Sequence, residues 1–183
     1  MHKLYDFIEA RERLTTVVVK TKLIHSPVFS EESGNEIYLK PENLQKTGSF
    51  KIRGAYNKIA KLTEEEKKKG VIASSAGNHA QGVAYAAKRL GIKAVIVMPK
   101  HTPLIKVEAT RKYGAEVVLH GEVYDDAYKK ALELQKENGY VFVHPFNDED
   151  VIEGQGTIAL EILDELPDAD IILVPLGGGG LVS

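Results

Sequence analysis

A lysine in an unusual setting is the first candidate for chemistry. The segment TGSFKIRGA, residues 47–55, places Lys51 between the apolar residues Phe50 and Ile52, at a predicted junction of a loop and a helix. A positive charge is unfavourable in the first turn of a helix, so this setting would lower the pKa of the amine. The neutral amine is the form that makes a Schiff base. A solvated surface lysine is the alternative interpretation.

A second segment could bind an anion. The residues SSAGNHAQG, positions 74–82, follow the apolar run Val71–Ala73 and precede a helical pattern. A strand that enters a helix through such a turn offers backbone N–H groups and two hydroxyls to a carboxylate or a phosphate. A plain helix cap with a tight turn is the other interpretation. A lone histidine here, His79, is more typical of a packed or capping residue than of a catalytic base.

A third segment, LGGGGL at positions 176–181, follows the apolar run Ile171–Val174. Four consecutive glycines leave backbone N–H groups open to phosphate oxygens, and a following helix would add its dipole. The segment matches neither the dinucleotide pattern GxGxxG nor the ATP-binding pattern GxxxxGK[ST]. It therefore predicts a phosphate-binding loop without naming the ligand, and a flexible turn is the alternative.

The composition argues against several classes of function. The chain has no cysteine, which removes disulfides, thiolate metal sites and cysteine nucleophiles. Its histidines form no i, i+4 pair and no HExxH motif, so a histidine metal site has no support. A formal net charge of -2 gives no basic field for nucleic acid. Because no apolar run approaches the roughly 20 residues of a membrane span, we expect a cytoplasmic protein without a membrane partner.

The elements that must position these segments follow from the hydrophobic pattern. From Val71 onward, short apolar runs alternate with helical segments, which is the pattern of repeated βα units. The runs Ala94–Val97, Val117–Leu119 and Ile171–Val174 carry no polar residue on either face, as in parallel strands covered by helices on both sides. The sequence predicts an α/β fold with a doubly wound, mostly parallel sheet.

Apolar spacing also predicts which helix faces are buried. One helix would bury Tyr124, Ala127, Tyr128, Ala131 and Leu134, and another would bury Ile152, Gly156, Ala159, Leu160 and Leu163. The helix after Asn78 is rich in alanine and glycine, so its neighbours should pack closely.

Before Val71 the pattern is less regular. It predicts a helix over Leu4–Leu14, an exposed stretch near Ser30–Asn35, a strand at Glu36–Lys40, a helix over Lys51–Leu62, and a solvated helix or turn at Thr63–Gly70. At the other end, a predicted strand at Ile171–Pro175 and the glycine turn are followed by three residues where a helix should begin. We therefore expect a longer parent protein whose sheet continues past Ser183.

Together the three segments resemble the fold type II family of pyridoxal 5'-phosphate enzymes, most closely its branch of threonine dehydratases (threonine ammonia-lyases) and serine racemases. The resemblance covers essentially the whole chain, and SFKIRGA, SSAGNHAQG and GGGGL in this order are jointly very specific. It implies a fold like that of the tryptophan synthase β subunit. It also implies a small α/β domain at residues 71–147 and a large domain that joins residues 1–70 to 148–183.

The resemblance implies pyridoxal 5'-phosphate as the cofactor and a role for each motif. Lys51 would be the catalytic residue and would bind the cofactor as a Schiff base, Phe50 would pack beside its ring, and Asn78 would hydrogen-bond its O3' atom. Its phosphate would bind to Gly177, Gly178, Gly179, Gly180 and Leu181. The substrate carboxylate would bind to Ser75, Ala76, Gly77, Asn78 and His79. The partner of the pyridine nitrogen would lie beyond Ser183.

The implied reaction is β-elimination of L-threonine, and of L-serine, to 2-oxobutanoate or pyruvate and ammonia. Racemases of the family carry a serine where this chain has Ala76, which favours elimination over racemisation, and IRGA and HAQG count against cysteine synthesis. A racemase or another type II lyase, and a phosphate-binding α/β module without chemistry, remain as alternatives, as does an inactive fragment. The resemblance further implies a small amino-acid substrate and a homo-oligomer, either a dimer or a tetramer.

Overall fold

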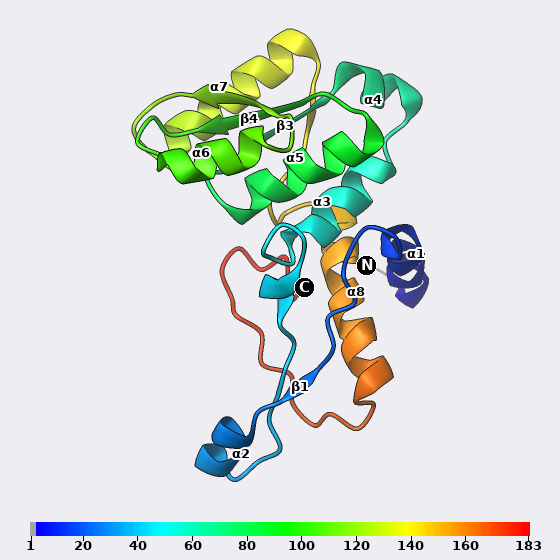
Figure 1. Cartoon of the computed structure of the whole chain (residues 1–183). Coiled ribbons are helices and arrows are strands. Elements are labelled where there is room, and N and C mark those ends of the chain that lie inside the picture. Colours follow the sequence, from blue (N-terminus) through cyan, green and yellow to red (C-terminus); the bar gives the residue numbers. More distant parts are fainter. Residues whose placement is uncertain (1–2) are drawn as a thin grey trace.

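The computed structural model describes residues 3–183 and divides into a layered upper part and an extended lower part (Figure 1). The helices are α1 (Leu4–Leu14), α2 (Pro27–Ser33), α3 (Lys51–Ala60), α4 (Glu64–Lys69), α5 (Asn78–Leu90), α6 (Leu104–Arg111), α7 (Tyr124–Asn138) and α8 (Glu149–Glu165), with a short 3₁₀ helix η1 (Glu42–Leu44). The strands are β1 (Ile24–His25), β2 (Tyr38–Leu39), β3 (Val71–Ser74), β4 (Ala94–Met98), β5 (Glu116–Leu119) and β6 (Val141–Phe142).

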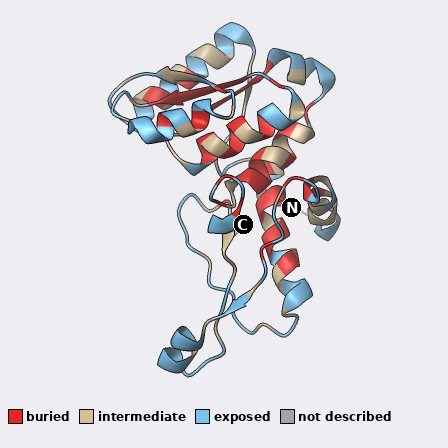
Figure 2. Ribbon diagram, viewed as in Figure 1, coloured by how far each residue is buried: buried red, intermediate tan, exposed pale blue. Residues whose placement is uncertain are grey.

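The main sheet has four parallel strands in the order β5-β4-β3-β6. One face packs on α5, α6 and α3 through Val71, Ala73 and Ile96, and the other packs on α7 through Ile72 and Val95. Figure 2 shows that buried residues gather in β3, β4 and the helices beside them. The predicted α/β fold with a parallel sheet is confirmed.

The strand order creates a switch point. From β3 the chain continues to β4 and β5 on one side, and it then returns to place β6 on the other side of β3. The loops that leave the carboxyl ends of β3 and β6 therefore diverge, and ligands of open α/β sheets bind in the crevice that forms there. The switch point lies directly after Ser74 and Phe142.

Two predicted strands differ from the structure. β5 forms, but it is an edge strand that pairs only with β4, so Val117 and Val118 are half-buried and Leu119 is exposed. The run Ile171–Val174 is irregular, with Ile171 78% and Leu173 88% exposed. An apolar run becomes a strand only where a neighbouring strand satisfies its backbone groups, and no strand among residues 3–183 pairs with this one.

The buried face of α8 also differs from the prediction. The buried residues are Val151, Glu153, Gly154, Gln155, Thr157, Ile158 and Glu161. Of the predicted face, Ala159 and Leu163 are exposed and the other three members are only half-buried. The reason is that α3 presents a buried arginine and closely approaching backbone to α8, and these features require polar or small partners. Apolar periodicity cannot detect such a face.

The other helices agree more closely with the pattern. α1 has the predicted bounds, α4 lies inside the predicted segment, and α7 buries Ala127 and Ala131 while Tyr124 stays exposed. The stretch near Ser30–Asn35 is exposed, but much of it is helical in α2, and the strand before Lys40 is only Tyr38–Leu39. α3 ends at Ala60, two residues earlier than predicted.

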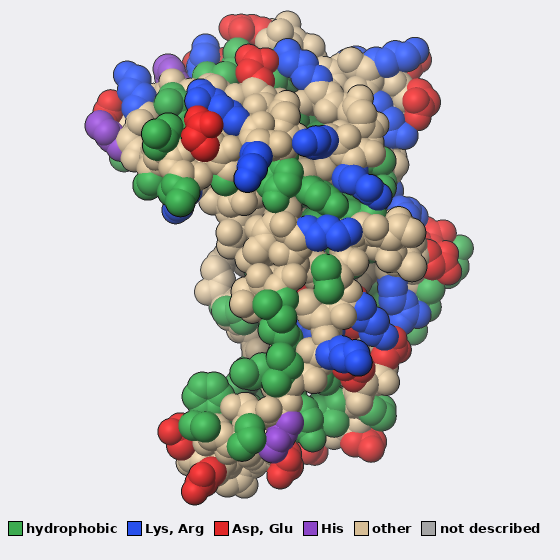
Figure 3. Space-filling model, in the orientation of Figure 1, with side chains coloured by type: hydrophobic (Ala, Val, Ile, Leu, Met, Phe, Trp, Pro, Cys, Tyr) green, Lys and Arg blue, Asp and Glu red, His purple; other side chains and the backbone are tan. Residues whose placement is uncertain are grey.

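The surface carries mixed charge and one region rich in exposed apolar side chains. Figure 3 shows Lys and Arg interspersed with Asp and Glu on the visible face, as the small net charge suggests. Exposed apolar side chains of the lower part include Val28, Phe29, Leu39, Leu44, Ile171, Leu173 and Leu176. Within residues 3–183, no helix is long and apolar enough to cross a membrane, and no group of three His, Asp or Glu side chains is placed to hold a metal ion.

Candidate functional site

Lys51 is the first residue of α3, and its side chain reaches the loop after β6. Its Nζ donates a hydrogen bond of 2.5 Å to the carbonyl oxygen of Pro145 and lies 5.2 Å from the centre of the Phe50 ring. Burial lowers the pKa of this amine, because partial removal from water disfavours the charged form. The direction agrees with the sequence prediction, and the cause that the structure identifies is burial.

The loop after β3 lies beside this lysine. The Oγ of Ser75 accepts a hydrogen bond of 3.2 Å from the backbone of Gly77, and Ala76 is half-buried against the sheet core. Asn78 is the exposed first residue of α5. The backbone N–H groups at the start of α5 therefore open onto the carboxyl end of the sheet, as an anion site requires.

His79 is packed rather than free to exchange protons. It is only 3% exposed, and its Nε2 donates a 2.9 Å hydrogen bond to the carbonyl oxygen of Val143. Burial, with a further contribution from the positive charge of Lys51, lowers its pKa to about 4. The ring is thus neutral near pH 7 and ties the start of α5 to the chain after β6. The sequence interpretation of a packed histidine is confirmed.

The glycine segment wraps around Phe146. A Cβ atom added at Gly178 would lie 2.4 Å from the Phe146 ring, and one at Gly180 would lie 2.7 Å from the Phe146 backbone. Gly179 has a φ of +88°, which side chains rarely adopt. The backbone N–H groups of Val182 and Ser183 both donate hydrogen bonds to the carbonyl oxygen of Gly179, with N to O distances of 3.0 and 3.1 Å. Glycine is therefore required here for close approach as well as for conformation.

Residues 143–146 contact all three motifs, the lysine segment, the loop after β3 with the start of α5, and the glycine loop. Val143 accepts from His79, Pro145 accepts from Lys51, and Phe146 lies against the glycine loop. The sequence analysis did not identify this segment, because its contribution is backbone carbonyls and one ring, which leave no distinctive spacing.

Several buried hydroxyls near Lys51 have no hydrogen-bond partner in the described protein. They are the Oγ1 of Thr47 and the Oγ of Ser49, four and two residues before Lys51, and the Oγ of Ser74 at the end of β3. Buried polar groups are nearly always hydrogen-bonded, so unpaired hydroxyls at the carboxyl end of a sheet indicate a site for a polar ligand.

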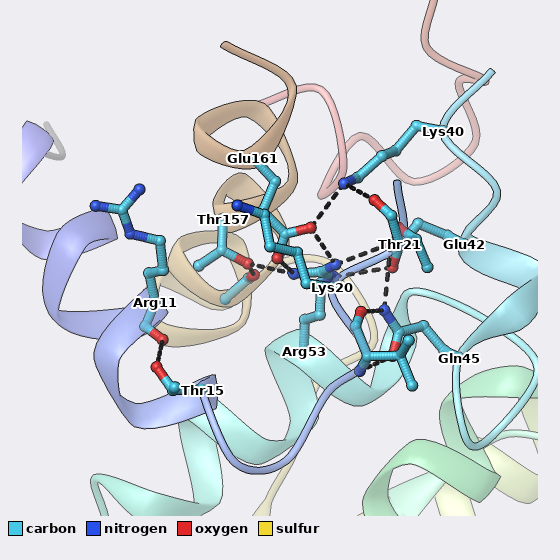
Figure 4. Close-up of polar contacts among 12 residues, drawn as sticks. Arg11, Thr15, Lys20, Thr21, Lys40, Glu42, Gln45, Arg53, Thr157 and Glu161 are labelled. Atoms are coloured by element: carbon cyan, nitrogen blue, oxygen red, sulfur yellow. Dashed lines mark hydrogen bonds and ion pairs between the residues drawn. The ribbon is translucent and has the colours of Figure 1, made fainter. Parts of the chain in front are cut away.

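The sequence analysis also missed the residues that hold α3 in place (Figure 4). The Arg53 guanidinium is fully buried and makes two contacts of 2.8 Å with Glu42, and contacts of 2.7 and 2.9 Å with Glu161. It also donates to the Oγ1 of Thr157 at 3.1 Å. A signal was present in the sequence, since Glu153, Thr157 and Glu161 recur every four residues along α8.

Glycines let α3 approach its two neighbours. A Cβ atom at Gly82 of α5 would lie 3.1 Å from the backbone of Lys51. A Cβ atom at Gly154 of α8 would lie 2.6 Å from the carbonyl oxygen of Arg53, and one at Gly54 would clash with Gln155. The close packing predicted for the helix after Asn78 is confirmed, and it occurs at the lysine itself.

Comparisons with known proteins match the arrangement. Residues 14–183 match the family model described as pyridoxal-phosphate dependent enzyme. The chain is 61% identical over 183 residues to the L-threonine ammonia-lyase of Thermotoga maritima, covering 100% of this chain and 46% of that protein. It is 53% identical over 178 residues to the catabolic L-threonine dehydratase TdcB of Escherichia coli K12, covering 97% of this chain and 54% of that protein.

Solved structures of related enzymes superimpose closely on this chain. Maize serine racemase superimposes with a TM-score of 0.95 at 39% identity, over 98% of this chain and 55% of that one. Threonine deaminase isoform 2 from Solanum lycopersicum gives 0.91 at 42% identity, over 99% of this chain and 51% of that one. The chain spans about half the length of the relatives that it matches.

Proposed function

Because the chain belongs to the family of pyridoxal-phosphate dependent enzymes, we propose that it carries the reactive lysine and the phosphate loop of a threonine ammonia-lyase. The proposed reaction converts L-threonine into 2-oxobutanoate and ammonia, and L-serine into pyruvate and ammonia. The observation that carries the proposal is the Lys51 amine. Its pKa is lowered by burial, and it donates to the carbonyl oxygen of Pro145. The next residue, Phe146, contacts the glycine loop.

The residues present fit a phosphate-bearing aldehyde. Lys51 supplies the amine that would hold the aldehyde carbon, and Phe50 supplies a ring beside it. The glycine loop would hold the phosphate through Gly177, Gly178, Gly179, Gly180 and Leu181. The unpaired hydroxyls of Thr47, Ser49 and Ser74 offer further donors to a polar ligand. We assign Asn78 to the polar edge of the ring, as the family resemblance implies.

The chain's own residues would divide the chemistry as follows. When bound, pyridoxal phosphate withdraws electrons from the substrate α-carbon and so acidifies its hydrogen. The Lys51 amine, whose pKa is lowered by burial, would accept that proton in its neutral form. The backbone around Ser75–His79 would hold the substrate carboxylate at the start of α5. Loss of the α-hydrogen as a proton and of the β-hydroxyl together amounts to one molecule of water, and a second water then replaces the nitrogen, which is released as ammonia. Threonine therefore gives 2-oxobutanoate and ammonia without an external oxidant.

Ala76 supports elimination over racemisation. A racemase needs a second acid–base group on the face opposite the lysine, and this position supplies a methyl group packed on the core. The likeness to maize serine racemase keeps racemisation as the second candidate, although the identity, 39%, is lower than the 61% to the Thermotoga maritima ammonia-lyase. A dimer or tetramer remains a prediction from the family resemblance, and a cytoplasmic location remains a prediction from the composition.

Borohydride trapping tests the proposal on the full-length protein. Pyridoxal phosphate is added, an absorbance spectrum is taken before and after reduction, and the modified peptide is mapped. We expect one reduced adduct, on Lys51. Incubation with L-threonine should then give 2-oxobutanoate and ammonia in equal amounts. D-allo-threonine from L-threonine, or D-serine from L-serine, as the main product would favour the racemase. Adducts scattered over surface lysines would contradict the enzyme and favour a phosphate-binding module.

A further inference from the structure

Two cations occupy opposite sides of the first turn of α3. Lys51 and Arg53 are two residues apart, which places their side chains about 200° apart around a helix axis. Lys51 reaches Pro145 in the crevice at the carboxyl end of the sheet. Arg53 reaches Glu42 and Glu161 on the other side. Any rotation of this turn that moved Arg53 would therefore also move the Lys51 amine.

The Arg53 side is a closed network with balanced charge (Figure 4). Arg53 and Lys40 supply two positive charges, and Glu42 and Glu161 supply two negative ones. Lys40 lies 2.7 Å from Glu161, and Thr21 donates to Glu42 at 2.7 Å. Burial alone would lower the pKa of Arg53, but its hydrogen bonds to Glu42 and Glu161 raise it above the usual value.

The network adds a polar restraint to the packing of α3. Gly82 on one side and Gly154 on the other prevent α3 from moving toward α5 or α8, because backbone atoms already touch there. The buried side chains of Ile52, Ala55 and Ile59, with polar contacts of Asn57 and Lys58 further along α3, oppose rotation about the helix axis. Two bidentate pairs from one planar guanidinium fix that rotation, since they set its plane against two separate elements, η1 and α8.

We propose that Arg53 is a positioning residue for Lys51, and that its paired carboxylates set the direction in which the lysine amine enters the crevice. The inference rests on the proposed function of Lys51. A buried ion pair is weak evidence for added stability, whereas fixing one geometry is an attested use of such groups. The reacting amine must be aligned closely, and a displacement of about 1 Å can lower turnover by about a hundredfold.

Arg53→Lys tests this in the full-length protein with pyridoxal phosphate. Lysine keeps the charge but cannot form two bidentate pairs. We expect turnover of threonine per mole of Lys51 adduct to fall by about tenfold or more, with KM changed by less than about twofold. We also expect the visible circular dichroism per mole of bound cofactor to change, because the cofactor follows the lysine. Dividing turnover by the amount of Lys51 adduct corrects for any loss of folded protein in the variant.

Lys58→Gln is the matched control. Lys58 lies on the same helix and also joins α3 to α8, through contacts of 3.1 Å with Asp148 and 2.9 Å with Asp150. It is a full helical turn or more from Lys51, so its loss should leave turnover and dichroism per adduct unchanged. An equal drop in both variants would show that any weakening of the contact between α3 and α8 has this effect, and would overturn the positioning role.

Thr157→Val decides the question if Arg53→Lys does not fold. It removes the hydrogen bond that Thr157 accepts from Arg53, together with the one it donates within α8 to the carbonyl oxygen of Gly154, with little change in shape. It should lower turnover per adduct by about threefold with the same change in dichroism. Wild-type values in both Arg53→Lys and Thr157→Val would overturn the inference while leaving the proposed function intact. A wild-type protein without a Lys51 adduct would overturn both.

Discussion

The two cationic side chains in the first turn of α3, Lys51 and Arg53, have pKa values shifted in opposite directions. Lys51 is half-buried and donates to a single backbone carbonyl, and burial lowers its pKa. Arg53 is fully buried and contacts both oxygens of two carboxylates, and these hydrogen bonds raise its pKa despite burial. Lys51 and Arg53 lie two positions apart, yet the pKa of one is lowered and the pKa of the other is raised.

The difference shows that burial does not by itself decide the role of a charged group. Both side chains lose water, but only Arg53 recovers that loss through anionic partners. A carbonyl oxygen stabilises the ammonium of Lys51 less than a carboxylate would, and burial shifts its pKa toward the neutral amine, which is the form that acts as nucleophile and base. We therefore regard the Lys51 side as the reactive side and the Arg53 side as the anchoring side.

The largest effect should come from the reactive side. Lys51→Ala removes the amine, and we expect loss of the borohydride-stable adduct and a fall in threonine turnover of at least about a thousandfold, because the residue would act as both base and covalent anchor. Lys46→Ala is the control, since Lys46 also donates to a backbone carbonyl, that of Val17, and should keep the Lys51 adduct. Equal turnover in wild type and Lys51→Ala would remove the distinction between the two sides.

Substitution on the anchoring side should lower the free energy of unfolding. Arg53→Met leaves Glu42 and Glu161 short of a buried partner, and we expect it to lower the free energy of unfolding by about 4 kcal/mol in urea titrations. Arg11→Met removes an exposed pair with Asp164 and should cost about 0.5 kcal/mol or less. Similar losses in the two variants would mean that the buried network is no more important than a surface ion pair.

Acid should destabilise the reactive side through His79. Its pKa falls from 6.5 to about 4 on folding, so between those pH values the unfolded chain binds more protons and stability decreases as the pH falls. The full difference corresponds to about 3 kcal/mol, at about 1.4 kcal/mol per pH unit. Urea titrations of wild type and His79→Gln at pH 7 and pH 4 measure it. We expect a smaller loss in the variant, and equal losses would contradict the buried neutral ring.

The glycine loop should show the smallest effect. Gly178→Ala places a methyl group against the Phe146 ring, and we expect the Kd for pyridoxal phosphate, measured by fluorescence titration, to rise about tenfold as the loop shifts. Phe146→Leu in the same chain should recover part of that affinity by making room. If the double variant binds more weakly than Gly178→Ala alone, the contact with Phe146 is not the cause.

The sequence predicted the reactive side better than the anchoring side. Each part of the reactive side lies in a short contiguous motif: Lys51, the loop after β3 and the glycine loop. The parallel strands β3 and β4 are largely apolar runs that the sequence also shows. Arg53 lies inside the first motif, yet its role depends on Glu42 and Glu161, which are 11 and 108 residues away in the chain. Such separations leave no contiguous motif, and the recurrence of polar residues every four positions along α8 does not name Arg53 as their partner.

What the sequence determined by itself is therefore local: the βα alternation, the start of α3 at Lys51, and the glycines whose conformation or close contacts exclude a side chain. The tertiary structure decided which groups surround these positions. It selected the polar face of α8 over the apolar one, left Ile171–Val174 without a strand partner, and brought Pro145 to Lys51. The physical reason is that helix and turn formation depend on near neighbours, whereas burial, strand pairing and charge compensation depend on partners that only the fold brings together.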